Sequence, residues 1–247
     1  MPIKRMTMLG RLLDVNNSRR GILPPNAGKP CFEFVRRESK MLLDTPENQG
    51  ISSLLISDFL EELNADDTLN MHNVVIARNG KIVCEAYFGA HRSGVWKATF
   101  SACKSVVSIA IGMLIYEGKL TYETRLEDIF PNEMKSISKL RVKGITVYDL
   151  LTMRSGMTAL EETGAMNESE LFKAFINTPL SSDPGKKFFY NSTNTYVLSC
   201  IVKKVSGQNL SAYLEKRLFA PLEIKDYYWE KSAEGIEFGG WGLYISP

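Results

Sequence analysis

The stretch TFSACKSVVSIAIGMLIYEGKL, residues 99–120, decides the fold of this chain. It predicts a helix that begins at Ser101 and runs to about Glu117, with Gly118 as the residue that ends it. Apolar residues cover nearly every side of this helix, with the main face formed by Val106, Ile109, Met113 and Leu114. Because a helix that is apolar all round is buried in the middle of a domain, we expect the core to form around it.

A β-hairpin is predicted shortly before this helix. Residues 73–78 (NVVIAR) and 81–88 (KIVCEAYF) are rich in strand-forming residues, and Asn79-Gly80 between them tolerates the positive φ values of a type I′ turn. Two strands alone make a marginal sheet, and the pattern after the hairpin predicts helices but no further strands. The sheet therefore needs partner strands that this chain does not obviously contain.

An arm and several helices account for the rest of the chain. Residues 1–50 are punctuated by Gly and Pro, which predicts an extended arm rather than a domain. An amphipathic helix is predicted over 52–63, with an apolar face of Leu55, Ile56, Phe59, Leu60 and Leu63. Further helices are predicted after a capping box at Thr146–Asp149 and over 168–177, 194–206 and 209–218. We expect one domain over 51–247, with a helical part over about 120–220.

The composition is that of a globular protein. Hydrophobic residues make up 44% of the 247 residues and charged residues 23%, which excludes a disordered or collagen-like chain. A net charge of +2 gives no field that would attract nucleic acid or an anionic membrane. No apolar run approaches the roughly 20 residues of a membrane span, and the N-terminus lacks a secretory signal pattern. We expect a soluble cytoplasmic protein, whose oligomeric state the sequence does not specify.

The cysteines and histidines exclude several kinds of site. The four cysteines are too scattered for a CxxC pair or a zinc knuckle and are expected as reduced core residues: Cys31, Cys84, Cys103 and Cys200. Of the two histidines, His72 is interpreted as structural and His91 as a surface residue. The motifs GxSxG, GxxxxGK[ST], GxGxxG and HExxH are absent. We expect neither a metal nor an organic cofactor.

One Ser-x-x-Lys pair, Ser101 and Lys104, is the first candidate site. A second pair, Ser136 and Lys139, lies in a polar segment where a lysine stays hydrated, so the motif alone carries little weight. Ser101 and Lys104 begin the apolar helix, and residues at i and i+3 share a face, so Lys104 should lie beside the Ser101 hydroxyl in a buried setting. Burial favours the neutral amine, which can accept the serine proton. The backbone N–H of Ser101 is a candidate oxyanion donor.

Tyr190 is a second candidate. It lies in a loop bounded by Pro184-Gly185, just before a predicted helix, from which its side chain can project into a cleft. A tyrosine packed in the core is the simpler alternative.

Five segments, taken together and in this order, resemble the serine β-lactamase-related superfamily, most closely its class C branch. They are VVIARNGKIVCEAYF (74–88), TFSACKSVVSIAIGMLIYEGKL (99–120), ITVYDLLTMRSGM (145–157), FFYNSTNTYVLSCIVKKVSG (188–207) and GGWGLYISP (239–247). That branch includes class C β-lactamases, D-alanyl-D-alanine peptidases, family VIII esterases and 6-aminohexanoate-dimer hydrolases. The resemblance implies an α+β, β-lactamase/transpeptidase-like fold in which an antiparallel sheet accompanies a helical domain.

The resemblance also implies roles for four residues. Ser101 would be the acylated nucleophile and Lys104 its base partner, while Tyr190 would pass a proton to the leaving group and then activate water. Ser192 stands where the family often has asparagine; as a substrate-binding residue it would contact a carbonyl less readily, which puts β-lactam hydrolysis in doubt. The family's third motif, Lys or His followed by x-Gly on a C-terminal strand, has no match after Tyr190. We therefore expect the C-terminal strands to be missing from this chain.

These inferences predict a serine hydrolase that cleaves an amide or ester of a small molecule through a covalent acyl-enzyme. The sequence does not name the substrate. The alternative is a non-catalytic penicillin-recognising or scaffolding protein of the same fold, which the missing third motif favours. A thiol-dependent regulator that uses Cys103 is a further hypothesis, although buried packing explains this cysteine equally well.

Overall fold

The computed structural model describes residues 41–134, 140, 142–159 and 170–246. The chain divides into two compact units, which are described one at a time: unit 1 holds the residues up to Lys97 and those from Ile245, and unit 2 is Ala98–Tyr244. Most of the predicted arm, Cys31, and the Ser136 and Lys139 pair lie outside the described residues.

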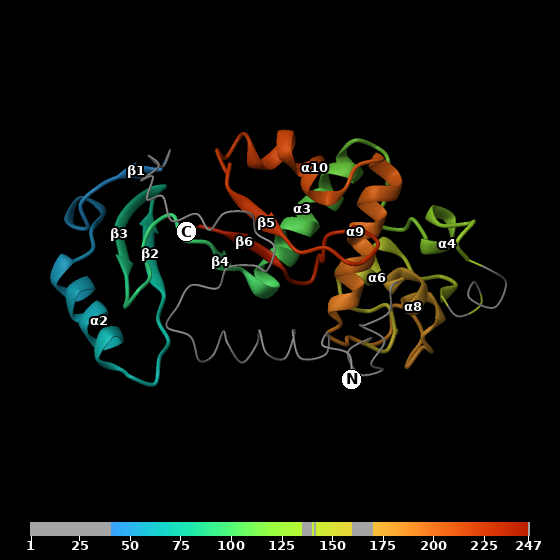
Figure 1. Cartoon of the computed structure of the whole chain (residues 1–247), viewed down its shortest axis with the longest axis horizontal. Coiled ribbons are helices and arrows are strands. Elements are labelled where there is room, and N and C mark those ends of the chain that lie inside the picture. The colour runs from blue at the N-terminus through green and yellow to red at the C-terminus, as the bar shows by residue number, and fades with distance from the viewer. Residues whose placement is uncertain (1–40, 135–139, 141, 160–169, 247) are drawn as a thin grey trace. The chain divides into compact units, whose positions relative to one another are not determined.

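Unit 1 contains the predicted hairpin and a third strand that the sequence did not reveal (Figure 1). Strands β2 (Asn73–Arg78) and β3 (Lys81–Tyr87) pair antiparallel. Asn79 and Gly80 between them have φ values of 52° and 73°, as the predicted turn requires. The two-residue strand β1 (Leu42–Leu43) pairs parallel to β3 and gives the order β1-β3-β2. A short 3₁₀ turn, η1 (Glu47–Gln49), follows β1.

Helix α2 (Ser53–Ala65) confirms the helix predicted over 52–63. Ser52 caps it, since its side chain accepts a hydrogen bond from the N–H of Leu55. No residue of α2 is buried, and Leu55 and Phe59 of its predicted apolar face are 68% and 44% exposed. The other three residues of this face, Ile56, Leu60 and Leu63, are half-buried.

Unit 2 is built around helix α9 (Ser192–Ser206), which the sequence did not place at the centre. The helical elements are η2 (Phe100–Ala102), α3 (Cys103–Tyr116), α4 (Leu126–Ile129), α6 (Val147–Leu151), α8 (Leu171–Asn177), α9 (Ser192–Ser206), α10 (Leu210–Leu214) and the π-helical turn η4 (Glu215–Phe219). Helix α9 contacts α3, α4, α6, α8 and α10, and its residues 193–202 are all buried. Gly207, with φ of 73°, ends α9.

Helix α3 is buried along one face only, so the expectation that it would be buried all round is wrong. Its buried residues recur at helical spacing: Cys103, Val107, Ala110, Ile111 and Leu114. Ile109, which we placed on the inner face, is 43% exposed. The continuous apolar sequence hid which side of the helix faces the core, because hydrophobic periodicity carries that information only when polar residues alternate with apolar ones.

A second small sheet has the strand order β4-β6-β5. Its strands are β4 (Lys97–Ala98), β5 (Tyr227–Trp229) and β6 (Leu243–Ile245). The prediction that no strand follows the hairpin is therefore wrong. Runs of two or three residues are too short to show the alternating pattern from which a strand is recognised.

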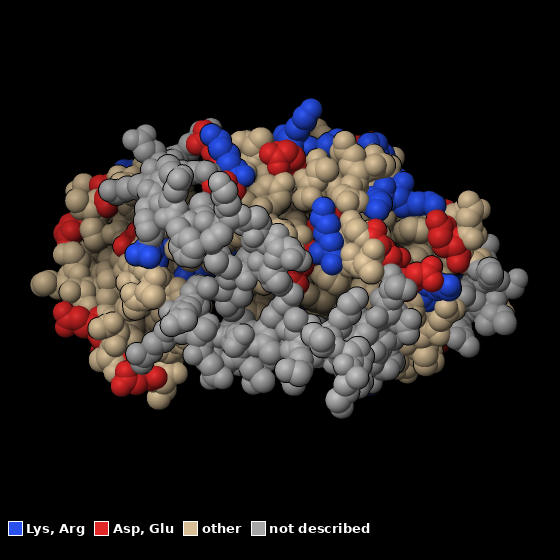
Figure 2. Space-filling view, viewed as in Figure 1, with Lys and Arg blue, Asp and Glu red and all other residues tan. Residues whose placement is uncertain are grey.

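The surface matches the nearly neutral composition. On the face seen in Figure 2, Lys and Arg side chains lie among Asp and Glu side chains over the coloured part of the molecule. Within the described part of the chain, every helix is too short or too polar to cross a bilayer.

Candidate active site

Ser101 and Lys104 lie one turn apart where η2 runs into α3, and both belong to unit 2. The Lys104 amine donates a hydrogen bond to the Ser101 hydroxyl at 3.1 Å. Thr99, two residues before the serine, is bound to β6, because both its N–H and its hydroxyl donate to the carbonyl of Leu243 at 2.9 Å. The start of the motif is thus fixed to the small sheet.

Phe100, immediately before the serine, has a φ of 45°. A bulky side chain is disfavoured in this left-handed region, and strained backbone of this kind is concentrated at functional sites. This feature could not be read from the sequence, because phenylalanine gives no sign of a positive φ.

Tyr190 reaches the same place from the segment that leads into α9. Its phenol oxygen lies 2.7 Å from the Ser101 hydroxyl. The residues on either side hold the segment in place: the N–H of Phe189 donates to the carbonyl of Met153, and the Asn191 amide donates to the carbonyl of Met157 at 3.1 Å. Tyr190 itself is 52% exposed, so it is not the core tyrosine of the simpler alternative.

The surroundings of Lys104 are polar rather than apolar. Besides Ser101, its amine donates to the hydroxyl of Ser192 at 3.3 Å and to the carbonyl of Gly240 at 2.6 Å. The lysine is half-buried and the serine exposed. The buried, apolar setting that we expected around this pair is therefore absent, and three oxygen atoms surround the nitrogen instead.

Two opposing effects act on the phenol of Tyr190. Partial burial raises its pKa, but hydrogen bonds with Lys104 and Ser101 and the positive charge of the lysine outweigh it, so the pKa lies below its usual value of 10.0. The lysine nitrogen also lies 5.0 Å from the centre of the tyrosine ring. A lowered pKa leaves a larger fraction of the tyrosine as phenolate near neutral pH, and the phenolate is the form that can accept a proton.

Gly240 is a member of the site that the sequence interpretation missed. The segment GGWGLYISP entered the sequence interpretation only through the family resemblance, yet its second glycine supplies the shortest hydrogen bond to Lys104. The signal was the Gly239-Gly240 pair, since adjacent glycines often mark a place where the backbone closely approaches another element.

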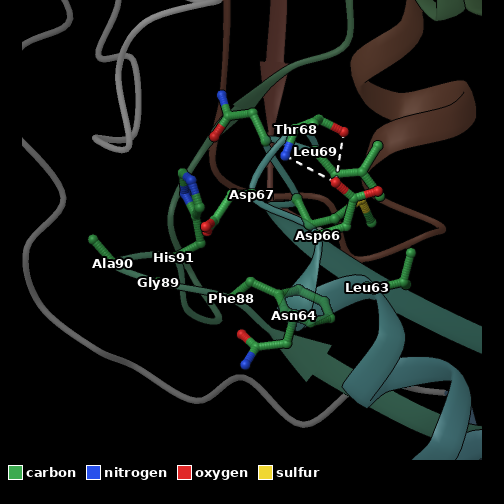
Figure 3. A pocket seen from close by; sticks show the side chains of 12 residues that line it. Leu63, Asn64, Asp66, Asp67, Thr68, Leu69, Phe88, Gly89, Ala90 and His91 are labelled. Atoms are coloured by element: carbon green, nitrogen blue, oxygen red, sulfur yellow. Dashed lines mark hydrogen bonds between the residues drawn. The ribbon is translucent and has the colours of Figure 1, made fainter.

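The hollow drawn in Figure 3 lies in unit 1 and does not include the Ser101 site. It has a volume of about 400 Å³ and is lined by residues 63–64, 66–71 and 88–91. His91 on its wall is only 6% exposed, so its interpretation as a surface residue is wrong. Its ring packs on His72 and its Nδ1 contacts the Lys97 amine. Burial, with the nearby Lys97 charge, lowers the pKa of His91 to about 4.

The cysteines that the structure describes are free thiols. Cys103 and Cys200 are buried as predicted, whereas Cys84 is half-buried. Burial raises the pKa of Cys103 to about 12, so it remains a thiol rather than a thiolate. Within the described ranges, no three His, Cys, Asp or Glu side chains are grouped so that they could hold a metal ion.

Comparison with known sequences identifies relatives over most of the chain. The family model described as Beta-lactamase matches residues 56–244. PbpX of Bacillus subtilis (strain 168) is 29% identical over 175 residues, which cover 67% of this chain and 42% of PbpX. The N-acetylmuramyl-L-alanine amidase of the same strain is 27% identical over 142 residues, which cover 53% of this chain and 32% of the amidase. The chain thus spans less than half the length of these curated relatives.

Solved structures show the same fold. FmtA from Staphylococcus aureus superposes with a TM-score of 0.67 at 17% identity, over 85% of this chain and 66% of FmtA. The octameric penicillin-binding protein homologue from Pyrococcus abyssi gives 0.62 at 23% identity, over 79% of this chain and 54% of that one. The predicted α+β, β-lactamase/transpeptidase-like fold is confirmed.

Proposed function

Because the chain belongs to the Beta-lactamase family, whose members are serine hydrolases acting as peptidases, amidases or esterases, we propose that it cleaves an amide or ester bond through an acyl-enzyme on Ser101. One observation carries this proposal: the Ser101 hydroxyl is hydrogen-bonded to both the Tyr190 phenol and the Lys104 amine. A serine hydroxyl is a weak nucleophile until a base removes its proton, and this one has two candidate bases within reach.

Lys104 and Tyr190 act as one acid–base pair in this proposal. A neutral lysine beside a neutral phenol and an ammonium beside a phenolate contain the same number of protons, so in this proposal the two residues share one proton. The polar contacts of Lys104 support the ammonium form, and the lowered pKa of Tyr190 supports the phenolate. The proton of Ser101 therefore passes to the pair along the 2.7 Å bond to Tyr190.

The reaction has two halves. The Ser101 oxygen attacks the substrate carbonyl as the pair takes its proton, and the Ser101 N–H is the proposed donor to the oxyanion. The tetrahedral intermediate collapses when the C–N or C–O bond breaks and the leaving group takes that proton from Tyr190. A water molecule then gives a proton to Tyr190 and attacks the acyl carbon, and Ser101 recovers its proton as the acid departs.

Ser192 keeps its proposed contact with the substrate. Its hydroxyl accepts the hydrogen bond from Lys104 at 3.3 Å and also helps to lower the pKa of the Tyr190 phenol, and a bound substrate carbonyl would compete with that phenol for the Ser192 proton. This residue would therefore connect the base pair and the bound substrate.

Covalent labelling tests the proposal. A fluorophosphonate probe should add to the peptide that contains Ser101, as located by mass spectrometry, and Ser101→Ala should remove both the adduct and about a thousandfold or more of the hydrolysis of a chromogenic ester. Ser136→Ala, in the second Ser-x-x-Lys pair, is the matched control and should keep both. Undiminished turnover by Ser101→Ala would refute the assignment. The absence of an adduct on the correctly folded wild type would favour the non-catalytic alternative.

A further inference from the structure

The backbone at Gly239 and Gly240 is pressed against the first turns of α9. A Cβ atom at Gly239 would lie 2.4 Å from the carbonyl oxygen of Thr195 and 2.6 Å from the hydroxyl of Ser199. At Gly240 it would lie 2.9 Å from both Cβ and the carbonyl oxygen of Ser192. Such distances are too short for any side chain, so the segment can take this path only because both residues are glycine.

This close approach aligns two successive carbonyl groups with the start of α3. The carbonyl of Gly239 accepts a hydrogen bond from the Cys103 thiol at 3.2 Å, and the carbonyl of Gly240 accepts one from the Lys104 amine at 2.6 Å. The same two glycines therefore contact α9 on one side and neighbouring residues of α3 on the other. The glycine segment connects the helix of the nucleophile to the helix that begins beside Tyr190.

Cys103 is placed to act through this contact rather than through its own reactivity. Its side chain is completely buried, and at neutral pH it is a thiol that can donate a hydrogen bond. Its bond fixes the peptide immediately before the carbonyl that binds Lys104. A thiol inside the Ser-x-x-Lys motif thus has a structural use that requires no thiol chemistry.

We propose that Cys103 is a positioning residue for the Ser101 reaction, acting through the Gly239–Gly240 backbone to hold Lys104 against the Ser101 hydroxyl. The inference rests on the proposed function, because it assigns a task within the same site. Loss of the thiol donor would let the Gly240 carbonyl move, and misplacement of a catalytic group by even a fraction of an ångström lowers a rate substantially.

Three cysteine variants of the full chain test the role of the thiol. Cys103→Ala removes the donor, and the rate of Ser101 labelling by the fluorophosphonate should fall about 10- to 100-fold, with an altered dependence on pH. Cys103→Ser restores a donor and should recover most of the rate. Cys200→Ala removes a buried thiol from α9 away from these contacts and should label within about twofold of the wild type. Thermal unfolding of each variant separates lost positioning from lost stability.

Two glycine variants test the backbone contact itself. Gly240→Ala should reduce labelling at least as much as Cys103→Ala. Gly112→Ala, in α3, meets no atom within 4 Å and should label normally. Wild-type labelling with an unchanged pH profile in Cys103→Ala would overturn the inference, as would equal losses in Cys103→Ala and Cys200→Ala that follow their unfolding temperatures.

A structural readout distinguishes this inference from the proposed function. In crystal structures, the distance from the Lys104 amine to the Gly240 carbonyl should exceed hydrogen-bonding length in Cys103→Ala and remain near 2.6 Å in Cys103→Ser. An unchanged distance in Cys103→Ala overturns the positioning role, whatever the labelling shows. If the wild type is never labelled at Ser101, the proposed function fails, and this measurement still decides whether Cys103 positions Lys104.

Discussion

At the scale of single residues, the contacts of Lys104 decide which chemistry the site can carry. Its amine meets three oxygen atoms, from Ser101, Ser192 and Gly240. An ammonium group has three donors and no acceptor, so this arrangement suits its charged form. A positive charge held beside a phenol in turn favours the phenolate, and this is how the lysine can promote removal of the serine proton without being neutral at the outset.

Replacement of Lys104 by methionine should raise the pKa of Tyr190 toward its usual value of 10.0. In the wild type, burial opposes ionisation but the hydrogen bond and charge of Lys104 overcome it, so the phenolate forms at a lower pH than in free tyrosine. Without the lysine, only the hydrogen bonds with Ser101 and Ser192 oppose the effect of burial on the pKa. Tyrosinate absorbance, measured as the difference from Tyr190→Phe in each background, should therefore rise at a higher pH in Lys104→Met.

The control for this titration is Lys204→Met, which removes an ammonium that pairs with Glu133 at 2.6 Å. Its Tyr190 titration should match that of the wild type. If Lys104→Met also titrates like the wild type, the two residues are not coupled, and the proposed shared proton is wrong.

At the scale of elements, the burial of α3 and α9 is the reverse of what their sequences suggest. The residues of α3 are apolar almost throughout, yet one side of it is exposed. Helix α9 begins with polar residues, and Thr193, Asn194, Thr195 and Ser199 are all buried. Hydropathy predicted the existence and approximate ends of both helices, but burial depends on what surrounds an element, and that is decided by tertiary packing.

Buried polar residues in α9 are tolerated because some of them have partners on neighbouring segments. The Asn194 side chain, fully buried, accepts a hydrogen bond at 2.8 Å from Ser155, which follows α6 and is itself buried. The capping box at Thr146 and Asp149, which the sequence predicted, begins α6 and is confirmed. Local signals of this kind could be read from the sequence, whereas the Ser155–Asn194 pair could not, because its members are distant in the chain.

Ser155→Ala should destabilise the protein by about 1–3 kcal/mol, because it leaves the Asn194 carbonyl oxygen buried without its donor. The free energy of unfolding in urea measures this loss. Ser199→Ala is the matched control: its hydroxyl is equally buried but bonds weakly, at 3.4 Å, to the Thr195 carbonyl of its own helix. Removal of the Ser199 hydroxyl should therefore lower the free energy of unfolding by clearly less than Ser155→Ala does. Equal costs for the two variants would show that the link between α6 and α9 adds no stability beyond ordinary burial.

At the scale of the whole molecule, the sequence predicted the members of the site better than their surroundings. Ser101, Lys104, Tyr190 and Ser192 come together within unit 2, as the resemblance implied, although their roles remain predictions. What the sequence did not reveal depends on contacts between residues far apart in the chain, such as the Gly240 carbonyl on Lys104 and the strand β6 beside Thr99. Pairings over more than a hundred residues leave no local pattern to read.

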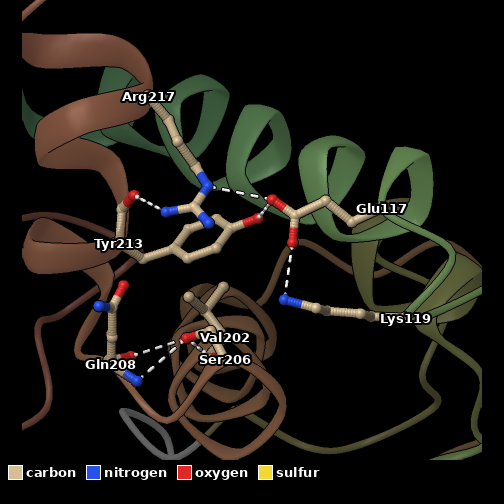
Figure 4. A network of polar contacts seen from close by, with 7 residues as sticks. All are labelled: Glu117, Lys119, Val202, Ser206, Gln208, Tyr213 and Arg217. Atoms are coloured by element: carbon tan, nitrogen blue, oxygen red, sulfur yellow. Dashed lines mark hydrogen bonds and ion pairs between the residues drawn. The ribbon is translucent and has the colours of Figure 1, made fainter.

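A network of charges makes a further long-range connection, between the end of α3 and the residues Tyr213 and Arg217 of α10 and η4 (Figure 4). The Glu117 carboxylate pairs with Lys119 at 2.8 Å and with Arg217 at 3.0 Å, and accepts a hydrogen bond from Tyr213 at 3.0 Å. These contacts lower the pKa of Glu117 from 4.5 to about 2. The hydrogen bond with Lys119 contributes most, and those from Arg217 and Tyr213 add to it. The ionised form of Glu117 is therefore more stable, relative to its protonated form, in the folded than in the unfolded chain.

Glu117→Gln should consequently lower the free energy of unfolding at pH 7. This loss should become smaller as the pH falls. The lowered pKa contributes stability that is fully present above pH 4.5 and is lost progressively toward pH 2, where the wild-type carboxyl becomes protonated as well. Urea unfolding of both proteins from pH 7 down to about pH 3 should show the difference narrowing below pH 4.5. Glu170→Gln, which removes an exposed pair with Lys173, is the control and should give only a small difference at any pH. A difference between Glu117→Gln and the wild type that stays constant across this range would mean that the glutamate acts through packing alone, since only a carboxylate stabilised by its charge loses its advantage on protonation.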